Sequence, residues 1–408
     1  MRHPEHHIFD FTPETLAAWC VERGMPKFRA AQVLEWVYKR GVVDPALMSN
    51  LSKLDREVLA REMVFLSGET VAEQAASDGT RKLLVEWEDL ENGKAAQPHS
   101  RKEESEGKET GGIRLPLMNM KVGGDSSRQT ECVMIPTEDR RTACISSQVG
   151  CPVGCKFCAS GLGGLDGSLS AGRIVEQVWR LARLLDEPQS TDRVAEPTRS
   201  VAREIQLGRI TNVVFMGMGE PLANLANVVH AVRTLNAEWG MGISARKITI
   251  STVGLPKAIE KLAEELDLPV TLALSLHAPN DEVRRQLIPW ANYTTIPELL
   301  AACKKWFDKT GREITLEYTL LHGVNDRPEH AEELARFAKT VRSNVNLIRY
   351  NEVKGLPFKR PETEDVLEFQ RLLRERNVNV HIRASRGRDI AAACGQLRHE
   401  KKAAGVGA

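Results

Sequence analysis

Residues 144–164 read CISSQVGCPVGCKFCASGLGG and contain four of the eight cysteines of the chain. Three of them, Cys151, Cys155 and Cys158, follow the spacing C-x3-C-x2-C, and Cys144 lies seven residues before the first. Three thiolates this close together can hold one face of a metal centre. Zinc usually takes a fourth ligand from a second C-x2-C pair, and the sequence has no matching pair. The spacing therefore favours a 4Fe–4S cluster with one iron left open for a chelating cofactor, ahead of a zinc ion or three unconnected core cysteines.

The composition of the chain points to a globular protein in a reducing compartment. Of the 408 residues, 42% are hydrophobic and 27% are charged, which are ordinary values for a chain of two or three domains. No apolar run approaches the length of about 20 residues that a membrane-spanning helix needs. The first residues, MRHPEHHIFDFTPETL, lack the basic start and apolar stretch of a secretory signal. We therefore expect a cytoplasmic protein with no membrane partner, whose cysteines serve metal or redox chemistry.

Basic side chains gather near both ends of the chain, although the formal net charge is only +1. Residues 23–41 contain five basic side chains against Glu35 alone. Residues 383–402 contain six against two acidic ones, the six being Arg383, Arg386, Arg388, Arg398, Lys401 and Lys402. Such clusters attract the phosphates of nucleic acids, and they are equally typical of solvated helix faces.

The N-terminal region carries helix signals and no strand pattern. Thr12 followed by Pro13 predicts a helix start, and Gly24 predicts its end. The stretch FRAAQVLEWVYKR (28–40) repeats its apolar residues at helical spacing. Further along the chain, residues 91–112 and 186–204 are polar and almost free of large apolar side chains, so we expect both to be surface loops.

From about residue 130 onward, apolar β-branched segments alternate with amphipathic helical ones. The six predicted strands lie at residues 211–217, 247–252, 270–276, 313–321, 344–350 and 377–384. This repetition predicts a parallel sheet or barrel covered by helices, in which the chemistry gathers at the carboxyl ends of the strands. The sequence therefore divides into a helical domain at residues 1–75, linking strands with the 91–112 insertion at residues 76–136, and an α/β core with a C-terminal cysteine segment at residues 137–408.

The cysteine motif has a further feature, the aromatic Phe157 immediately before the last cysteine. The resulting pattern resembles the signature of the radical S-adenosylmethionine (SAM) superfamily. That resemblance implies a partial (βα)6 TIM-like barrel and a 4Fe–4S cluster whose open iron binds the amino and carboxylate groups of SAM. It also implies that the reduced cluster cleaves SAM to methionine and a 5′-deoxyadenosyl radical, with the electron coming from a low-potential donor such as flavodoxin or ferredoxin.

Five motifs in order narrow the resemblance to one family. The sequence quoted above is followed by GMGEPLANLANVV (217–229), ITISTVG (248–254), SLHAPNDEVRRQLIP (275–289) and RGRDIAAACGQL (386–397). Together they resemble the RlmN family, and residues 28–42 resemble the accessory RNA-binding domain of that family. The resemblance implies a monomeric enzyme that methylates C2 of adenosine in 23S ribosomal RNA and in transfer RNA.

The family pattern also assigns residues that bind SAM. They lie at or just after strand ends, where glycines let a ligand approach the backbone and Glu220 can accept hydrogen bonds from the SAM ammonium. Without the resemblance, GMGEP would be interpreted as an ordinary strand-end turn with a solvated Glu220, and His277 as a structural histidine with its hydrogen bonds satisfied. By resemblance, the SAM site consists of Gly219, Glu220, Ser251, Ser275, Leu276, His277 and Asn351.

Three catalytic residues follow from the same resemblance, namely Cys394, Cys144 and Glu131. A first SAM methylates Cys394, and the deoxyadenosyl radical made from a second SAM removes a hydrogen from that methyl group. The methylene radical adds to C2 of adenine and links the enzyme to RNA. Glu131 then accepts the C2 proton, and Cys144 attacks the sulfur of Cys394, which forms a disulfide and releases the base. Without the resemblance, each cysteine would be interpreted as a small buried hydrophobe, and Glu131 as a solvated strand residue.

Three other interpretations remain open at this point. The related Cfr enzymes methylate C8 of the same adenosine with the same cluster and cysteine pair. A zinc-stabilised RNA-binding module without catalysis is an interpretation from a different class, and colour separates the two classes, because iron–sulfur proteins are brown. A radical SAM enzyme acting on a protein or metabolite is the third, and the cysteine pair and basic C-terminus count against it.

Overall fold

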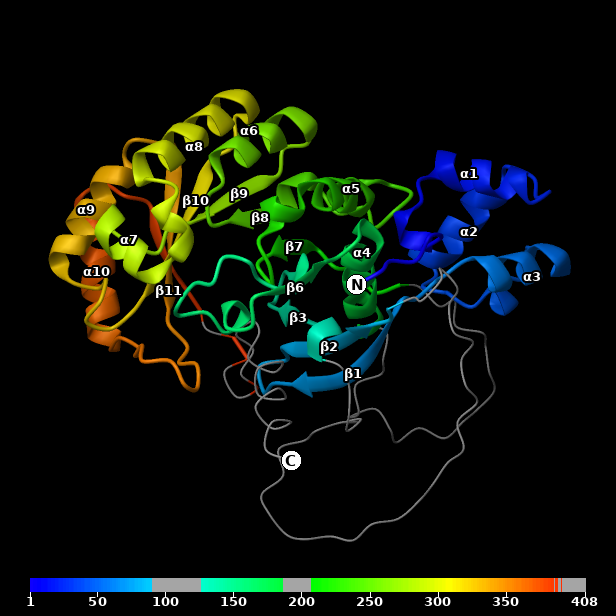
Figure 1. Ribbon diagram of the computed structural model, residues 1–408, viewed down its shortest axis with the longest axis horizontal. Coiled ribbons are helices and arrows are strands. Elements are labelled where there is room, and N and C mark those ends of the chain that lie inside the picture. The colour runs from blue at the N-terminus through cyan, green and yellow to red at the C-terminus, as the bar shows by residue number, and fades with distance from the viewer. Residues whose placement is uncertain (90–125, 186–206, 385, 388–389, 391–408) are drawn as a thin grey trace, which may run out of the picture.

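The structure is a computed structural model that describes residues 1–89, 126–185, 207–384, 386–387 and 390. Its main feature is one ten-stranded sheet with the strand order β1-β2-β3-β4-β7-β8-β9-β10-β11-β12 (Figure 1). Seven neighbouring strands of this sheet are parallel: β4 (Arg141–Cys144), β7 (Asn212–Phe215), β8 (Ile248–Thr252), β9 (Thr271–Ser275), β10 (Ile314–Leu320), β11 (Ser343–Arg349) and β12 (Val380–Arg383). The six strands predicted from the sequence are all present, and the prediction of an α/β barrel fold is confirmed.

Helices connect the parallel strands and cover the outer side of the curved sheet (Figure 1). In chain order they are α4 (Ala171–Arg183), α5 (Leu225–Asn236), α6 (Pro256–Glu265), α7 (Asp281–Leu287), α8 (Ile296–Thr310), α9 (Pro328–Ala338) and α10 (Thr363–Glu375). Local sequence sets their ends: the Thr295 hydroxyl and the Glu298 carboxylate form a capping box at the start of α8, and Gly311 ends it with φ +65°. The buried faces of these helices and the strands form one large apolar core.

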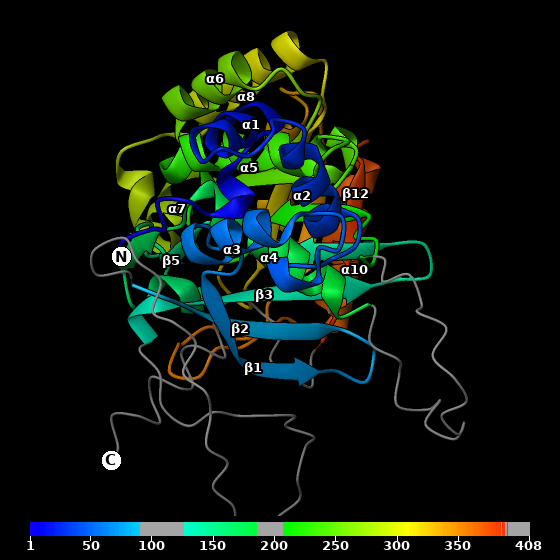
Figure 2. The same ribbon diagram turned by 90° about the vertical axis from the view of Figure 1, so that its right-hand side faces the viewer.

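The strands before the barrel extend the same sheet in antiparallel fashion. β1 (Gly68–Ala75), β2 (Arg81–Trp87) and β3 (Gln129–Pro136) pair in order, and β3 pairs with β4. Figure 2 shows these three strands below the N-terminal helices. A small separate sheet consists of β5 (Gln148–Gly150) and β6 (Leu165–Ser168). The segment that links the N-terminal helices to the core is therefore hydrogen-bonded to the first barrel strand.

The N-terminal region contains three helices that pack against the first barrel helix, whereas residues 68–75 of the predicted helical domain form strand β1 because they pair with β2. Its helices are α1 (Pro13–Glu22), α2 (Arg29–Tyr38) and α3 (Lys53–Glu62). Phe9 lies with its ring centroid 5.6 Å from that of Tyr38 and 6.1 Å from that of Trp179 on α4. The indole N–H of Trp179 donates to the carbonyl of Val37 at 3.0 Å. Within the described residues, no helix has the length and apolar composition that crossing a membrane requires.

A buried charge network joins this domain to α4. Glu176 is fully buried; its Oε2 accepts hydrogen bonds from the backbone N–H and the hydroxyl of Ser67, and it lies 3.1 Å from Nε2 of His7. Burial alone would raise the pKa of this carboxyl, but the charge of Arg180 and the contacts with His7 and Ser67 lower it to about 2. Because the folded-state pKa lies below the unfolded value, the network stabilises the fold at neutral pH.

We expect Glu176→Gln to lower the free energy of unfolding by about 3 kcal/mol at pH 7. The stabilisation is present above the unfolded pKa of about 4.5 and is lost as the pH falls toward 2, so the deficit should shrink to less than half at pH 3. Urea unfolding of both chains at the two pH values measures it. Glu35→Gln, which removes an exposed partner of Arg40, is the matched control and should change little. An equal deficit at both pH values would contradict this account.

Candidate active site

The three clustered cysteines lie in the loop between β5 and β6. Glycine is required at the entrance to this loop, since Gly150 has φ +79° and a Cβ there would lie 2.0 Å from the carbonyl oxygen of Gly164. This close approach lets the N–H of Cys151 donate to the same carbonyl at 2.8 Å. The N–H of Cys158 donates to the carbonyl of Cys155 at 3.1 Å. The loop is thus folded back on itself with its three thiols on one short stretch.

The cysteine loop packs on a small apolar cluster that is separate from the main core. Val153 and Phe157 of the loop are buried in it together with Leu287, Ile288 and Tyr350. The three cysteines are half-buried against this cluster. Burial, and to a lesser extent the Cys158 thiol, raises the pKa of Cys151 to about 12 although backbone N–H groups oppose the shift. Burial and the two other thiols raise the pKa of Cys155 well above its usual value. A positively charged metal centre would offset both effects, because it binds the thiolate form.

The donor set of the cysteine loop fits a cluster better than a single zinc ion. The loop offers three thiolates, whereas a structural zinc site takes four ligands. A 4Fe–4S cluster is held by thiolates, and three of them leave one iron open for another ligand.

The loop after β7 holds Gly219 and Glu220 beside the cysteine loop. Gly219 has φ +104°, and a Cβ there would lie 2.7 Å from Cβ of Gln148. The Glu220 carboxylate accepts hydrogen bonds from the N–H groups of Leu222 at 3.0 Å and Val253 at 2.7 Å. Burial raises its pKa to about 7 despite these hydrogen bonds. A ligand ammonium group at this position would favour the ionised form.

The end of β9 contributes Ser275, Leu276 and His277 to the same region. His277 is buried with φ +55°, and its ring centroid lies 5.2 Å from that of Phe157 in the cysteine loop. Burial, together with the charge of Arg284, lowers its pKa to about 3, so the ring is neutral at physiological pH. Its Nδ1 accepts from the N–H of Thr319 at 3.1 Å. The proton of the neutral ring therefore lies on Nε2, which can donate to a ligand.

Two further predicted residues lie at neighbouring strand ends. Ser251, at the end of β8, donates its hydroxyl to the carbonyl of Phe215 at 2.5 Å, which leaves its oxygen free to accept a hydrogen bond. Asn351 follows β11, and its Oδ1 accepts from Arg360 at 2.8 Å. Strand ends of a parallel barrel meet at one rim, which brings these side chains to the same side of the fold as Glu220 and His277.

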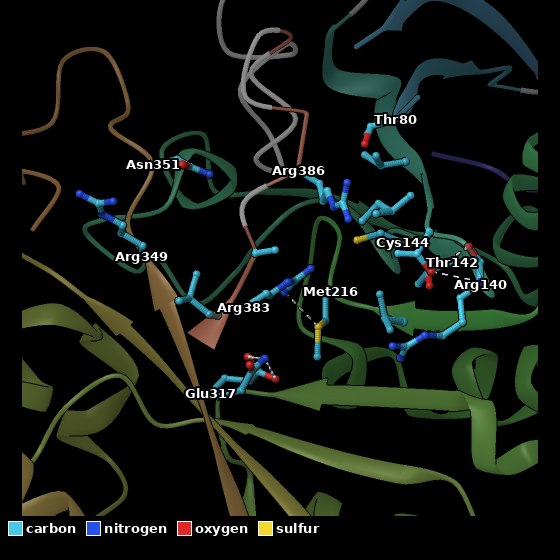
Figure 3. A pocket seen from close by; sticks show the side chains of 17 residues that line it. Thr80, Arg140, Thr142, Cys144, Met216, Glu317, Arg349, Asn351, Arg383 and Arg386 are labelled. Carbon is cyan, nitrogen blue, oxygen red and sulfur yellow. Dashed lines mark hydrogen bonds between the residues drawn. The ribbon is translucent and has the colours of Figure 1, made fainter. Parts of the chain in front are cut away.

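Cys144 and Asn351 line a cavity of about 530 Å³ at this rim, hereafter the Cys144 cavity. Four arginines line it as well, and Figure 3 shows Arg140 on the same side as Cys144, Arg349 beside Asn351, and Arg383 between them. The volume is in the range of sites for small ligands. The lining residues are Thr80, Val133, Ile135, Thr137, Arg140, Thr142, Cys144, Val214, Met216, Glu317, Asn346, Ile348, Arg349, Asn351, Arg383, Ala384 and Arg386. A cavity with a thiol and four guanidinium groups is suited to an anionic ligand such as a nucleotide.

The floor of the cavity carries a buried carboxylate. Glu317 on β10 accepts from the side-chain amide of Asn346 at 2.9 Å. Burial raises the pKa of Glu317, and the charge of Arg383 and the Asn346 amide oppose that shift. Glu317 pairs in register with Ser275 of β9, so the Cys144 cavity adjoins the group of predicted SAM ligands.

Glu131 lies next to the cavity and not among its lining residues. It is fully buried on β3, and its Oε2 lies 2.8 Å from Nζ of Lys82 on β2. The prediction that an isolated Glu131 would be solvated is therefore wrong, because β2 and β3 pair and bury this face. Cys394, the remaining predicted catalytic residue, lies outside the described residues. Two described residues that precede it in the sequence have known positions. Arg386 lines the cavity, and the N–H of Gly387 donates to Asp78 at 2.9 Å.

The sequence interpretation missed several residues of this region, including Lys82, Arg284, Glu317 and Arg349. A signal existed for Lys82, because it stands before the apolar run LLV within KLLVEW, and TECVMIP likewise holds one charge, Glu131, among apolar residues. Arg284 is fully buried beside the cysteine loop and donates to the carbonyl of Val253 at 2.5 Å. Cys20, Cys132 and Cys303 are buried and contribute to the main core.

Comparison with known proteins identifies the family. Residues 145–338 match the family model for the Radical SAM superfamily, and residues 6–64 match that for the Ribosomal RNA large subunit methyltransferase N-terminal domain. A relative from Bacillus thuringiensis, named probable dual-specificity RNA methyltransferase RlmN, is 38% identical over 395 residues, or 97% of this chain and 94% of the relative. A relative of the same name from Bacillus cereus matches equally well.

A solved structure agrees with these matches. The crystal structure of a radical SAM methyltransferase from Sphaerobacter thermophilus is 37% identical, has a TM-score of 0.78, and covers 96% of this chain and 98% of that chain. Radical SAM proteins use a 4Fe–4S cluster and SAM, so these are the cofactors of this protein. The predicted fold class and cofactors are thereby confirmed. The chain belongs to the RlmN family of radical SAM RNA methyltransferases.

Proposed function

We propose that this protein methylates C2 of adenosine in 23S ribosomal RNA and in transfer RNA. The observation that carries the proposal is the Cys144 cavity, in which a thiol lies among four arginines at the barrel rim. Arginines at such a rim suit the phosphates around a nucleotide that has left its stack. A methyl transfer by direct nucleophilic attack of the RNA on SAM would not need a cysteine thiol, so the presence of Cys144 favours the radical route. The names of the Bacillus relatives describe dual-specificity RNA methyltransferases, which supports a substrate range of more than one kind of RNA.

In this proposal the cofactors sit between the cysteine loop and the cavity. Cys151, Cys155 and Cys158 hold the cluster, and SAM occupies the strand ends that carry Gly219, Glu220, Ser251, Ser275, Leu276, His277 and Asn351. Glu220 accepts from the SAM ammonium, which the buried carboxylate is placed to do. The cluster and SAM together supply the 5′-deoxyadenosyl radical.

The chain itself supplies two thiols and one carboxylate. Cys394 carries the methyl group and, as its methylene radical, forms the bond to C2 of adenine. The adenine radical formed in this way would give up one electron to the oxidised cluster, and Glu131 accepts the C2 proton, which leaves a closed-shell adduct. The thiolate of Cys144 then attacks the sulfur of Cys394. The new S–S bond forms as the S–CH2 bond breaks, and the methylene carbon takes up a proton to become the methyl group. Arg386, eight residues before Cys394 in the sequence, lines the same cavity as Cys144, which supports this pairing of the two thiols.

The same proposal covers the roles of the domains, the electron donor, the oligomeric state and the cellular compartment. Residues 1–75 act as the RNA-binding accessory domain, residues 76–136 link it to the core, and residues 137–408 form the radical SAM core. A flavodoxin or ferredoxin supplies the electron. The enzyme works as a monomer in the cytoplasm.

The position of the new methyl group tests the proposal. Ribosomal RNA and transfer RNA from cells lacking this protein are incubated with the anaerobically reconstituted enzyme, SAM and a reductant, then digested to nucleosides. Chromatography with mass spectrometry is expected to show 2-methyladenosine from both RNAs. Formation of 8-methyladenosine instead would assign the Cfr type of reaction, and methylation of neither RNA would refute the proposal.

A further inference from the structure

Arg284, in helix α7, is a fully buried arginine with an unused donor group. Its Nε donates to the carbonyl of Leu276 at 3.3 Å, and its Nη2 donates to the carbonyl of Val253 at 2.5 Å. Its Nη1 is buried as well and has no hydrogen-bond partner among the described residues. Because a guanidinium is planar, the two carbonyls fix its orientation and leave the N–H groups of Nη1 without an acceptor. A buried donor without an acceptor is costly, so Nη1 is placed to serve a bound group.

The cysteine loop lies next to this guanidinium. The N–H of Lys156, within the loop, donates at 2.9 Å to the carbonyl of Leu287, the last residue of α7. Val283 and Leu287 of α7 belong to the same apolar cluster against which the three cysteines pack. Burial and the two neighbouring thiols raise the pKa of Cys155, and the positive charge of Arg284 opposes that rise. Helix α7 therefore supports the loop and brings the guanidinium close to one of its thiols.

The guanidinium remains charged in this buried place. Burial lowers the pKa of Arg284 to about 10, and Cys155 and Asp281 oppose the shift, so the group is a cation at neutral pH. The Asp281 side chain bonds elsewhere, since its Oδ1 accepts from the N–H of Ile296 at 2.8 Å. A buried cation is stabilised by an anion that accepts its hydrogen bonds. An iron–sulfur cluster held by three thiolates is such an anion, and its reduction adds to the negative charge.

We propose that Arg284 donates from Nη1 to the iron–sulfur cluster and makes the cluster easier to reduce. A cationic donor stabilises the reduced cluster more than the oxidised one, because the reduced cluster carries the larger negative charge. One electron passes from the reductant to the cluster in this step, and the guanidinium keeps all its protons. The inference rests on the part of the proposed function in which Cys151, Cys155 and Cys158 hold the cluster. It does not depend on which carbon of adenosine is methylated.

The reduction potential of the cluster tests this role without any RNA. The full-length, anaerobically reconstituted protein is titrated with dithionite in the absence of SAM, and electron paramagnetic resonance follows the reduced cluster. We expect Arg284→Met to lower the equilibrium constant for reduction by about tenfold, which for a one-electron couple is a shift of about 59 mV to more negative potential. Arg284→Lys keeps the charge but not the planar group, and should show a smaller shift in the same direction.

The neighbouring arginine is a matched control. Arg285 follows Arg284 in α7 and is exposed to solvent. Arg285→Met removes the same charge from the protein, but water screens an exposed charge, so the potential should equal that of the native protein. The iron content of each variant is measured first, so that loss of the cluster is not mistaken for a shifted potential.

A measurement on the native chain covers the case in which the Arg284 variants do not fold or do not bind iron. The protein is prepared with arginine that carries the heavier stable isotope of nitrogen in its guanidinium group. Pulsed electron paramagnetic resonance of the reduced cluster should then show a hyperfine coupling to that isotope, which unlabelled protein lacks. Absence of this coupling overturns the hydrogen bond from Nη1.

The remaining outcomes separate the inference from the function on which it rests. An unchanged potential in Arg284→Met with its full iron content overturns the role of Arg284. An unchanged potential together with weaker binding of SAM does so as well, and assigns the guanidinium to the carboxylate of SAM. If Cys155→Ala keeps its full iron content, the cluster site given in the proposed function is the part that fails.

Discussion

Replacing Cys151, Cys155 or Cys158 by alanine is expected to abolish iron binding and SAM cleavage, in each variant alone. The protein supplies three thiolates to the cluster in our proposal, so each variant leaves two, which is too few for a cluster that already has one open iron. The native chain should bind four irons and four sulfides after anaerobic reconstitution, and each variant close to none. Iron and acid-labile sulfide analysis measures this directly, and electron paramagnetic resonance of the reduced protein measures the intact cluster.

The fold of these variants should survive, which makes the result interpretable. The cysteine loop packs on a small apolar cluster of its own, whereas the barrel helices and strands share the main core. Far-ultraviolet circular dichroism and the thermal midpoint should therefore change little. Cys303→Ala is the matched control, since Cys303 is fully buried in α8 within the main core. It should keep its full iron content and lose about 1 kcal/mol of stability. A full complement of iron in any of the three loop variants would refute the cluster assignment.

The barrel could be predicted from the sequence because its strands are short apolar runs, and no position of β8 or β9 is exposed. The segments around β8 and β9, for example, appear as short β-branched runs between amphipathic helices, a pattern that few other folds produce. Helix ends followed from local chemistry in the same way, as at Thr12, which caps α1, and Pro13, its first residue. These features depend on residues within a few positions of one another.

Features that depend on contacts between segments far apart in the sequence could not be predicted. The contact between Lys82 and Glu131 requires that β2 pair with β3 in one particular register across a long intervening segment. Arg284 is a second example, because it is one of two adjacent arginines in α7. Only the packing of α7 turns Arg284 inward, where it donates to the carbonyl groups of Leu276 and Val253, and leaves Arg285 exposed. No local pattern separates the two.

Replacing Cys144 by alanine is expected to trap the enzyme on its RNA. In the proposed sequence of steps, Cys144 acts last, so methylation of Cys394, radical formation and addition to adenine should all proceed. The adduct would then have no thiol to attack the sulfur of Cys394. We expect turnover to fall to background and most of the active enzyme to become covalently linked to RNA. Mass spectrometry after nuclease digestion should find an adenosine on the peptide that contains Cys394.

The position of Cys144 gives this variant a close control. Cys132, on the neighbouring strand β3, is equally small and buried, but it belongs to the main core, whereas Cys144 lines the cavity. Cys132→Ala should therefore turn over and release its RNA, with at most a modest loss of stability. Cys394→Ala should form no adduct, and the double variant C144A/C394A should behave like Cys394→Ala, because the later step cannot matter once the earlier one is lost. Normal turnover by Cys144→Ala would show that Cys144 is not the thiol that releases the RNA. An adduct on a cysteine other than Cys394 would show that Cys394 is not the methyl carrier.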